Sequence, residues 1–262
     1  MILVVDIGNT HIVIGGYEGE HLSFVSRIST NARKTVDEYA SKLQSVLMIH
    51  GAREETIEGA IISSVVPPLT GIIKRAISMV YNVSPLVVDP GIKTGLNLRV
   101  DNPATVGADL ICACVGAKAH YPCPLVVIDM GTATKLMILD ETGTFIGVTI
   151  APGVEISLKA LASDTAQLPQ IDLTAPPVLL GKNTAECMRS GVVFGNACMI
   201  DGMLARMEEE LKTPLTKIAT GGLSGIIIPH CKQAIHMDPN IILEGLRLLY
   251  EKNTKADCRK TI

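Results

Sequence analysis

The sequence has no tryptophan and few other aromatic residues, with three Phe and five Tyr among 262 residues. Aromatic side chains form the base-stacking platforms of many nucleic-acid-binding proteins, and an excess of basic residues supplies their affinity for phosphates. That excess is missing too, because 23 Lys and Arg stand against 26 Asp and Glu, a formal net charge of -3. We therefore expect no nucleic-acid partner.

Long apolar runs are also absent. A helix that spans a bilayer needs about 20 consecutive apolar residues, and no run in this sequence approaches that length. The segment Met1–Asp6 lacks the basic start of a secretory signal and reaches an aspartate within six residues, so it is typical of a strand. We expect a soluble, cytoplasmic protein without a membrane partner.

Familiar metal and nucleotide motifs are missing as well. The seven cysteines form no C-x-x-C pair, and we expect them to be reduced thiols. The six histidines form no H-E-x-x-H pattern. Gly181–Thr184 resembles the end of a P-loop, but Pro176 replaces the first glycine that this motif needs, and Asn183 replaces its Ser or Thr.

What the sequence does contain is the pattern of an α/β protein. Hydrophobic residues make up 47% and charged residues 19%, which excludes disorder for the bulk of the chain. Short apolar runs alternate with segments whose apolar residues recur at helical spacing. We expect strands over 2–6, 10–17, 22–28, 60–65, 86–89, 125–129, 134–140, 144–150 and 215–219, and helices over about 36–47, 69–80, 105–119, 184–211 and 241–251.

A short motif near the N-terminus recurs in the second half of the chain. Asp6–Thr10 and Asp129–Ala133 both begin D-x-G followed by Asn or Thr, and both follow an apolar strand. A repeat at this scale indicates duplication, with two related α/β halves facing each other across a cleft. The prolines of Tyr121–Pro124 end a predicted helix, so we expect an N-terminal lobe over 1–120 and a C-terminal lobe over 121–262.

Each repeated turn can hold an anion. In the first, Gly8 and Asn9 both tolerate positive φ, so a tight hairpin can gather backbone N–H groups at its tip. Such groups bind phosphate, and the carboxylate at the preceding strand end can hold a hydrated cation. One such turn is more often a plain structural hairpin. Two of them, with Asp6 and Asp129, predict a clamp for a metal-nucleotide.

Two further segments carry candidate chemistry. The glycines of Ala219–Leu223 follow a predicted strand and would let a flat ligand approach the backbone, although a simple strand-to-helix turn also explains them. Asp109 opens an otherwise apolar helix. It is either an N-terminal acid favoured by the helix dipole or a general base that aligns an attacking hydroxyl during phosphoryl transfer.

Together these segments resemble the phosphate hairpins and adenosine turn of the sugar-kinase/heat-shock-ATPase/actin superfamily, and more closely the type III pantothenate kinase family. The resemblance runs along nearly the whole chain. It rests on Asp6–Thr10, Ser63–Pro67, Asp101–Pro103 with Gly107–Asp109, Asp129–Thr134, Ala151–Gly153, Ser163–Pro169, Gly181–Thr184 with Ser190–Gly191, and Ala219–Leu223.

This resemblance implies two ribonuclease-H-like lobes and ATP-dependent phosphorylation of the primary hydroxyl of pantothenate, the first step toward coenzyme A. It implies a homodimer that needs Mg²⁺ and a monovalent cation, K⁺ or NH₄⁺. Asp109 would be the proton acceptor, Asp129 would hold the monovalent cation, and Asp6 is a candidate Mg²⁺ ligand. The implied ATP-binding residues are Asp6, Ile7, Gly8, Asn9, Thr10, His11, Ile12, Val13, Thr132, Gly221 and Gly222. The implied substrate pocket is Gly107, Ala108, Asp109 and Leu110, with Thr184 from the partner subunit.

Two positions depart from the commonest pattern of the family. Leu110 stands where arginine often follows the catalytic aspartate, and Val100 stands where tyrosine often precedes D-N-P. Arg99 or Lys93 could supply the missing polar contact to the substrate. The departures keep open a kinase for another small hydroxy acid, and a nucleotide or metabolite sensor without catalysis is the alternative from a different class.

Overall fold

The computed structural model describes residues 1–163, 165 and 167–254. Asp164 and Ala166 of the predicted Ser163–Pro169 loop, and the end of the predicted polar tail, lie outside the described residues. The chain forms two compact units. Among the described residues, unit 1 contains Met1–Leu96, Asp101–Ala119 and 241–254, and unit 2 contains Asn97–Val100 and His120–Asn240.

Unit 1 is built on a five-stranded sheet with the order β3-β2-β1-β4-β5. Strands β1 to β3 are antiparallel neighbours, and β4 and β5 continue the sheet parallel to β1. The strands are β1 (Ile2–Ile7), β2 (His11–Glu18), β3 (His21–Ser29), β4 (Gly59–Ser64) and β5 (Leu86–Val87), and the helices are α1 (Val36–Ile49), α2 (Pro67–Tyr81), α3 (Ala108–His120, which ends in unit 2) and α7 (Ile241–Thr254), with short 3₁₀ turns η1 (Glu54–Thr56) and η2 (Pro103–Thr105).

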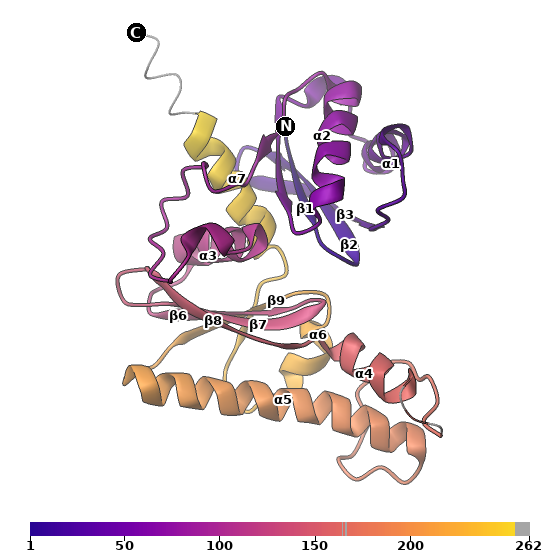
Figure 1. The fold of residues 1–262 in the computed structure, drawn as a ribbon, viewed down its shortest axis with the longest axis vertical. Coiled ribbons are helices and arrows are strands. Elements are labelled where there is room, and N and C mark those ends of the chain that lie inside the picture. The colour runs from indigo at the N-terminus through magenta and orange to yellow at the C-terminus, as the bar shows by residue number, and fades with distance from the viewer. Residues whose placement is uncertain (164, 166, 255–262) are drawn as a thin grey trace. The chain divides into compact units, whose positions relative to one another are not determined.

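Unit 2 repeats this plan with the order β10-β9-β6-β7-β8, again with three antiparallel strands followed by two parallel ones. Its strands are β6 (Leu125–Met130), β7 (Ala133–Leu139), β8 (Phe145–Pro152), β9 (Thr216–Thr220) and β10 (His236–Met237), and its helices are α4 (Val154–Ser163), α5 (Thr184–Leu211) and α6 (Ser224–Ile227), with the 3₁₀ turn η3 (Ile228–His230). Within unit 2, Figure 1 shows α5 running along one face of this sheet. The matching order of the two sheets confirms the predicted duplication.

Side-chain alternation decides which face of each sheet is packed. In unit 1, Leu3, Val5 and Ile7 of β1 join the apolar cluster formed with α1 and α2. In unit 2, the equivalent residues of β6, Val126, Ile128 and Met130, join the cluster formed with α4 and α5. Because successive side chains of a strand point to opposite faces, the strand-end aspartates of β1 and β6 face away from these helices.

The last helix belongs to the first unit, whereas the sequence-based division placed it in the second half. Helix α7 packs on β1 and β4. A β-carbon on Gly116 of α3 would overlap the Ile241 carbonyl oxygen, and one on Gly245 of α7 would overlap the Cys112 carbonyl group. The two helices therefore touch backbone to backbone, which fixes the position of α3. Nowhere in the described part of the chain is a helix both long and apolar enough to cross a membrane.

Candidate active site

The connection between β1 and β2 is a four-residue loop, since Ile7 pairs with Ile12, and it is not as tight as the predicted hairpin. The Gly8 N–H donates to the His11 carbonyl oxygen at 3.0 Å, and the Thr30 hydroxyl donates to the Gly8 carbonyl oxygen at 2.7 Å. Gly8 and Asn9 are not among the residues with positive φ, so that part of the prediction is wrong. Glycine is still favoured at position 8, because a β-carbon there would lie 3.0 Å from the His11 carbonyl oxygen.

Asp6 is placed by the register of unit 1. It lies opposite Val13 on β2 and opposite Ser63 on the parallel strand β4. The Ser63 side chain is fully buried. The carboxyl end of β1 therefore carries an acid with a buried hydroxyl residue beside it, on the face away from α1 and α2.

Asp109 is the second residue of α3, and its Oδ1 accepts the Leu110 N–H at 2.9 Å. A β-carbon on Gly107 would lie 2.6 Å from that same oxygen, so only glycine leaves room for the carboxylate in this position. The Leu110 N–H at the start of α3 therefore holds the acid, and the absence of a side chain at Gly107 leaves room for it.

The Cys112 thiol links the two acids. It is fully buried, and burial raises its pKa well above the usual value for a thiol. The charges of Asp6 and Asp109 raise it further, while a hydrogen bond with Ser63 acts in the opposite direction. Ser63 lies beside Asp6, and its side chain shares a hydrogen bond with Cys112, which follows Asp109 by one turn of α3. The two acids therefore lie in the same part of unit 1.

A strand-end carboxylate such as that of Asp6 fits Mg²⁺ bound together with a nucleotide. This ion usually keeps several waters and takes one or two carboxylates in addition to phosphate oxygens, so it needs no cage of protein ligands. In the described ranges no group of three or more His, Cys, Asp or Glu side chains forms such a cage. Asp6 alone can therefore supply the carboxylate expected for metal-bound ATP, which leaves Asp109 for the attacking alcohol.

Unit 2 brings its own predicted segments together. The Gly131 N–H donates to the Ala133 carbonyl oxygen at 3.2 Å across the β6–β7 connection. A β-carbon on Gly153, after β8, would overlap the Thr132 carbonyl group. Gly221, after β9, has φ of +93°, and a β-carbon there would lie 2.6 Å from the Met130 backbone. Glycines thus let the segments that follow β6, β8 and β9 meet at the carboxyl end of β6. Gly222, which follows Gly221, is exposed.

Asp129 has a cationic neighbour. It lies opposite Lys135 on β7 and opposite Thr220 on β9. The Lys135 Nζ is 2.8 Å from the Asp129 Oδ2, and both side chains are largely buried. The carboxylate predicted to hold K⁺ or NH₄⁺ therefore already faces an ammonium group of the same chain.

The segment Gly181–Thr184 caps a helix. Asn183 is the N-cap of α5, and its side chain accepts the Glu186 N–H at 3.0 Å. The Glu186 carboxylate in turn accepts the Lys182 N–H at 2.9 Å. Thr184 is the exposed first residue of α5, in unit 2, while Gly107, Ala108 and the other predicted pocket residues belong to unit 1.

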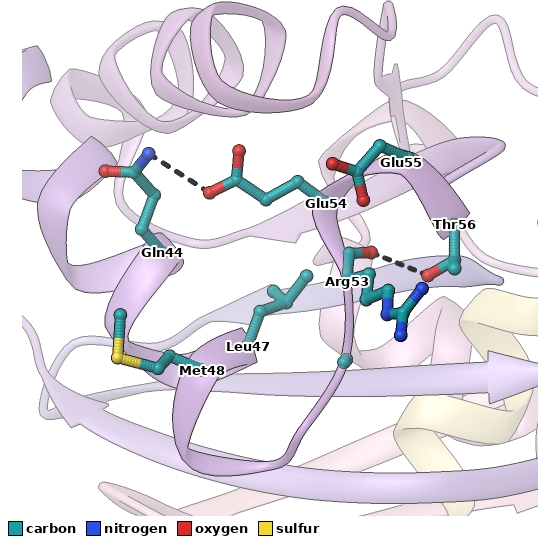
Figure 2. Close-up of a pocket in the computed structure, with 8 residues that line it drawn as sticks. Gln44, Leu47, Met48, Arg53, Glu54, Glu55 and Thr56 are labelled. Carbon is teal, nitrogen blue, oxygen red and sulfur yellow. Dashed lines mark hydrogen bonds between the residues drawn. The ribbon is translucent and has the colours of Figure 1, made fainter.

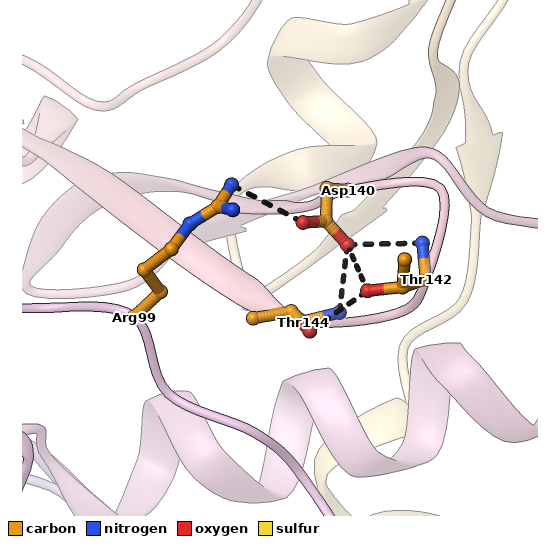
Figure 3. A network of polar contacts seen from close by, with 4 residues as sticks. All are labelled: Arg99, Asp140, Thr142 and Thr144. Atoms are coloured by element: carbon orange, nitrogen blue, oxygen red, sulfur yellow. Dashed lines mark hydrogen bonds and ion pairs between the residues drawn. The ribbon is translucent and has the colours of Figure 1, made fainter.

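The residues considered as replacements for the missing arginine are placed as follows. Leu110 is buried, so it contributes packing and no polar contact. Arg99 lies in unit 2, where its Nη2 is 3.2 Å from the Asp140 Oδ2; Figure 3 shows this contact beside Thr142 and Thr144. Lys93 belongs to unit 1, and its N–H donates to Asn253 at 3.0 Å. The guanidinium group of Arg99 is thus already engaged with a carboxylate.

An open cavity of about 850 Å³ in unit 1 does not belong to this site. It lies between α1 and η1, and Figure 2 shows Gln44, Leu47, Glu54 and Thr56 among its lining residues. Leu47 packs in the apolar cluster that covers the α1 and α2 face of the sheet. The cavity is therefore on the opposite face from Asp6.

Sequence reasoning missed three residues around these acids: Ser63, Cys112 and Lys135. Ser63 was part of a matching segment without a role, and Cys112 looked like an ordinary core residue. Lys135 carried a weak signal, because it is a lysine within an otherwise apolar strand just after a strand-end aspartate, and the register of β6 and β7 then sets it opposite Asp129. The equivalence of Ser63 with Thr220 becomes visible only from strand register.

Comparison with known proteins finds relatives along nearly the whole chain. Residues 2–206 match the family described as type III pantothenate kinase. A type III pantothenate kinase from an Exiguobacterium species is 45% identical over 255 residues, covering 97% of this chain and 100% of the relative.

Two solved structures share the fold. Component A of the Acidaminococcus fermentans (R)-2-hydroxyglutaryl-CoA dehydratase has a TM-score of 0.54 at 16% identity, covering 97% of this chain and 98% of its own. The ROK hexokinase of Thermus thermophilus has a TM-score of 0.50 at 14% identity, covering 97% and 99%. Such distant likeness supports the predicted two-lobed fold class and nothing further.

Proposed function

This chain belongs to the type III pantothenate kinase family, and we propose that it transfers the γ-phosphoryl group of ATP to the primary hydroxyl of pantothenate, the first step of coenzyme A synthesis. The observation that carries the proposal is the placement of two acids in unit 1, Asp6 at the carboxyl end of β1 beside Ser63 and Asp109 at the start of α3. A kinase needs one carboxylate for the metal-nucleotide and another for the attacking alcohol, and these two acids match that need.

In the proposed reaction Asp109 orients the pantothenate hydroxyl and accepts its proton. Phosphoryl transfer passes through a loose transition state, so the proton leaves late and positioning matters more than basicity. The hydrogen bond from the Leu110 N–H to the Asp109 Oδ1 supports this role because it orients the carboxylate, and Gly107 leaves room for it in that position. Asp6 is the proposed ligand of Mg²⁺, which when bound neutralises charge on the phosphates.

Both units carry segments that we propose to bind nucleotide. We assign the phosphates to the backbone N–H groups of the 6–13 segment in unit 1 and to Thr132 in unit 2. Gly221 and Gly222 are assigned to the adenosine, because a glycine backbone allows a flat ligand to approach closely. The close approach of Gly221 to the Met130 backbone supports this assignment, since it requires a residue without a side chain at this turn.

We further propose a homodimer in which α5 meets its copy and Thr184 completes the partner's substrate pocket. The exposed side of α5 is lined by small residues. Nothing lies within 4 Å of the β-carbon position of Gly191, Gly195 or Gly202, and Cys187 and Cys198 are exposed. A face of this kind lets a second helix approach closely.

The location that we propose is the cytoplasm. Cysteines 112, 114, 123, 187, 198 and 231 are free thiols, which suits that location.

A second candidate is a kinase for another small hydroxy acid. It rests on Leu110, which is buried where a polar contact to the substrate carboxylate is common. One assay separates the two: ADP release measured with pantothenate and with a panel of small hydroxy acids. Turnover with pantothenate alone supports the proposal, and turnover with another acid alone supports the second candidate. Nucleotide binding without turnover on any acceptor would contradict both and favour a sensor.

A further inference from the structure

The ion pair between Asp129 and Lys135 is fixed by the sheet. The two residues face each other across the antiparallel pair β6–β7, so their side chains leave the same face of the sheet. The Lys135 Nζ is 2.8 Å from the Asp129 Oδ2, and the lysine side chain is only 16% exposed. A strand in the middle of a sheet gives this lysine little freedom to move the ammonium group elsewhere.

The duplicated unit provides an internal comparison. Asp6 is the counterpart of Asp129, and the position opposite Asp6 on β2 is Val13. The first carboxylate thus has an apolar neighbour across its hairpin, and the second has a cation. The ammonium group at position 135 is therefore specific to the second hairpin and does not follow from the fold.

A further cation does not fit beside this pair. One carboxylate and one ammonium at contact distance already balance in charge, and another monovalent cation on the same carboxylate would be repelled by the ammonium at short range. The expectation that Asp129 holds K⁺ or NH₄⁺ therefore disagrees with the residues present. A lysine ammonium has the same charge as these ions and resembles NH₄⁺ in hydrogen bonding, with three donors instead of four.

We propose that the Lys135 ammonium is a tethered substitute for the monovalent cation at Asp129. The protein then binds no K⁺ or NH₄⁺ there, and its kinase reaction needs neither ion. The kinetic half of this inference rests on the proposed function, whereas the binding half does not. Removing the ammonium group should expose Asp129 and create the cation site that the wild-type chain lacks.

The binding test uses thermal unfolding of the full chain in KCl, NH₄Cl or choline chloride at equal ionic strength. Wild-type protein is expected to have the same Tm in all three salts. The Lys135→Met variant is expected to be less stable in choline chloride and to gain about 5 °C in KCl or NH₄Cl, with a saturable dependence on the ion. Lys135→Arg, which keeps the positive charge, should remain insensitive to the ion.

A matched control comes from another ion pair of unit 2. The Lys217 Nζ is 2.5 Å from the Glu208 Oε1, and the Lys217 side chain is 13% exposed. Lys217→Met removes a similarly buried lysine from a carboxylate that is not predicted to hold an ion. This variant should also lose stability, but KCl should restore it no better than choline chloride.

The kinetic test measures ADP release with pantothenate in the same salts. Wild-type turnover should change less than about twofold, while Lys135→Met should lose about tenfold in choline chloride and recover in KCl or NH₄Cl. A saturable, K⁺-specific rise in wild-type Tm would overturn the inference, and so would a Lys135→Met protein that folds but ignores K⁺. If neither protein turns over pantothenate, the proposed function fails while the Tm comparison still decides the inference.

Discussion

Gly107 and Asp109 are packed so closely that a β-carbon on Gly107 would lie 2.6 Å from the Asp109 Oδ1. The absence of a side chain at Gly107 therefore leaves room for the carboxylate to point toward the Leu110 N–H. Because the proposed reaction depends on the direction of this carboxylate, the relationship leads to the first prediction.

Gly107→Ala should lower kcat by about 10- to 100-fold with little change in the KM for ATP, because the added methyl group turns the Asp109 carboxylate away from the hydroxyl. Steady-state kinetics with pantothenate check this. Gly71→Ala on α2 is the control, since nothing lies within 4 Å of that β-carbon position. Equal kcat values for the two variants would show that the space beside Asp109 has no catalytic role.

Gly221→Ala should destabilise unit 2 and weaken nucleotide binding. The residue has φ of +93°, and its β-carbon would meet the Met130 backbone at 2.6 Å. A strained backbone of this kind costs about 1–3 kcal/mol, which corresponds to a fall in Tm of several degrees. Calorimetry with and without ATP measures both effects. Gly225→Ala, at an open position in α6, should keep Tm and affinity, and the assignment fails if both variants bind ATP equally well.

Gly195→Glu should convert the proposed dimer to a monomer with reduced activity. A glutamate on the small-residue face of α5 would place a charge where a second copy must pack closely. Sedimentation measures the oligomeric state. The matched control is Gly71→Glu, another open helical position, which should stay dimeric. A Gly195→Glu protein that sediments like wild type would exclude this face as the interface.

Asp140 should contribute to stability only above the range in which it titrates. The Thr142 hydroxyl, followed by the backbone N–H groups of Thr144 and Thr142 and the charge of Arg99, lowers its pKa below the usual value. A lowered pKa in the folded state gives stability that is complete above the unfolded pKa of about 3.9 and is lost as pH falls through the folded value. Asp140→Asn should therefore be less stable than wild type at pH 7.

Urea denaturation from pH 7 down to pH 3 checks this prediction. The difference in midpoint between wild type and Asp140→Asn should be constant above about pH 5 and should shrink below about pH 4. A difference that is independent of pH would mean that the charge of Asp140 contributes nothing, and that only the shape of its hydrogen-bonded turn matters.

The regular elements could be predicted from the sequence because their patterns are local. Apolar runs such as Leu125–Met130 gave the strands, and the repeated D-x-G motif gave the duplication that the matching sheet orders confirm. Strand β10 was not predicted, because its two residues are exposed and show no apolar pattern. The predicted positive φ in the first turn was wrong because the β1–β2 connection is longer than the shortest hairpin.

The surroundings of the candidate site depend on contacts between distant segments. Asp6, Ser63 and Cys112 come from three elements, and only the parallel register of β1 and β4 together with the placement of α3 joins them. The assignment of α7 to unit 1 likewise follows from packing on β1 and β4, which no local pattern encodes. The ion pair of Asp129 with Lys135 also depends on register, because the strand-end aspartate pairs six residues on in this hairpin and seven residues on in the first one.

The central claim is that Asp109 accepts the proton of the pantothenate hydroxyl, and Asp109→Asn tests it most directly. Asparagine keeps the shape of the side chain and its contact with the Leu110 N–H, but it cannot take up the proton. We predict that turnover falls by about 10² to 10⁴ while ATP affinity, measured by calorimetry, stays close to that of wild type. Turnover near the wild-type rate with ATP binding intact would contradict the claim.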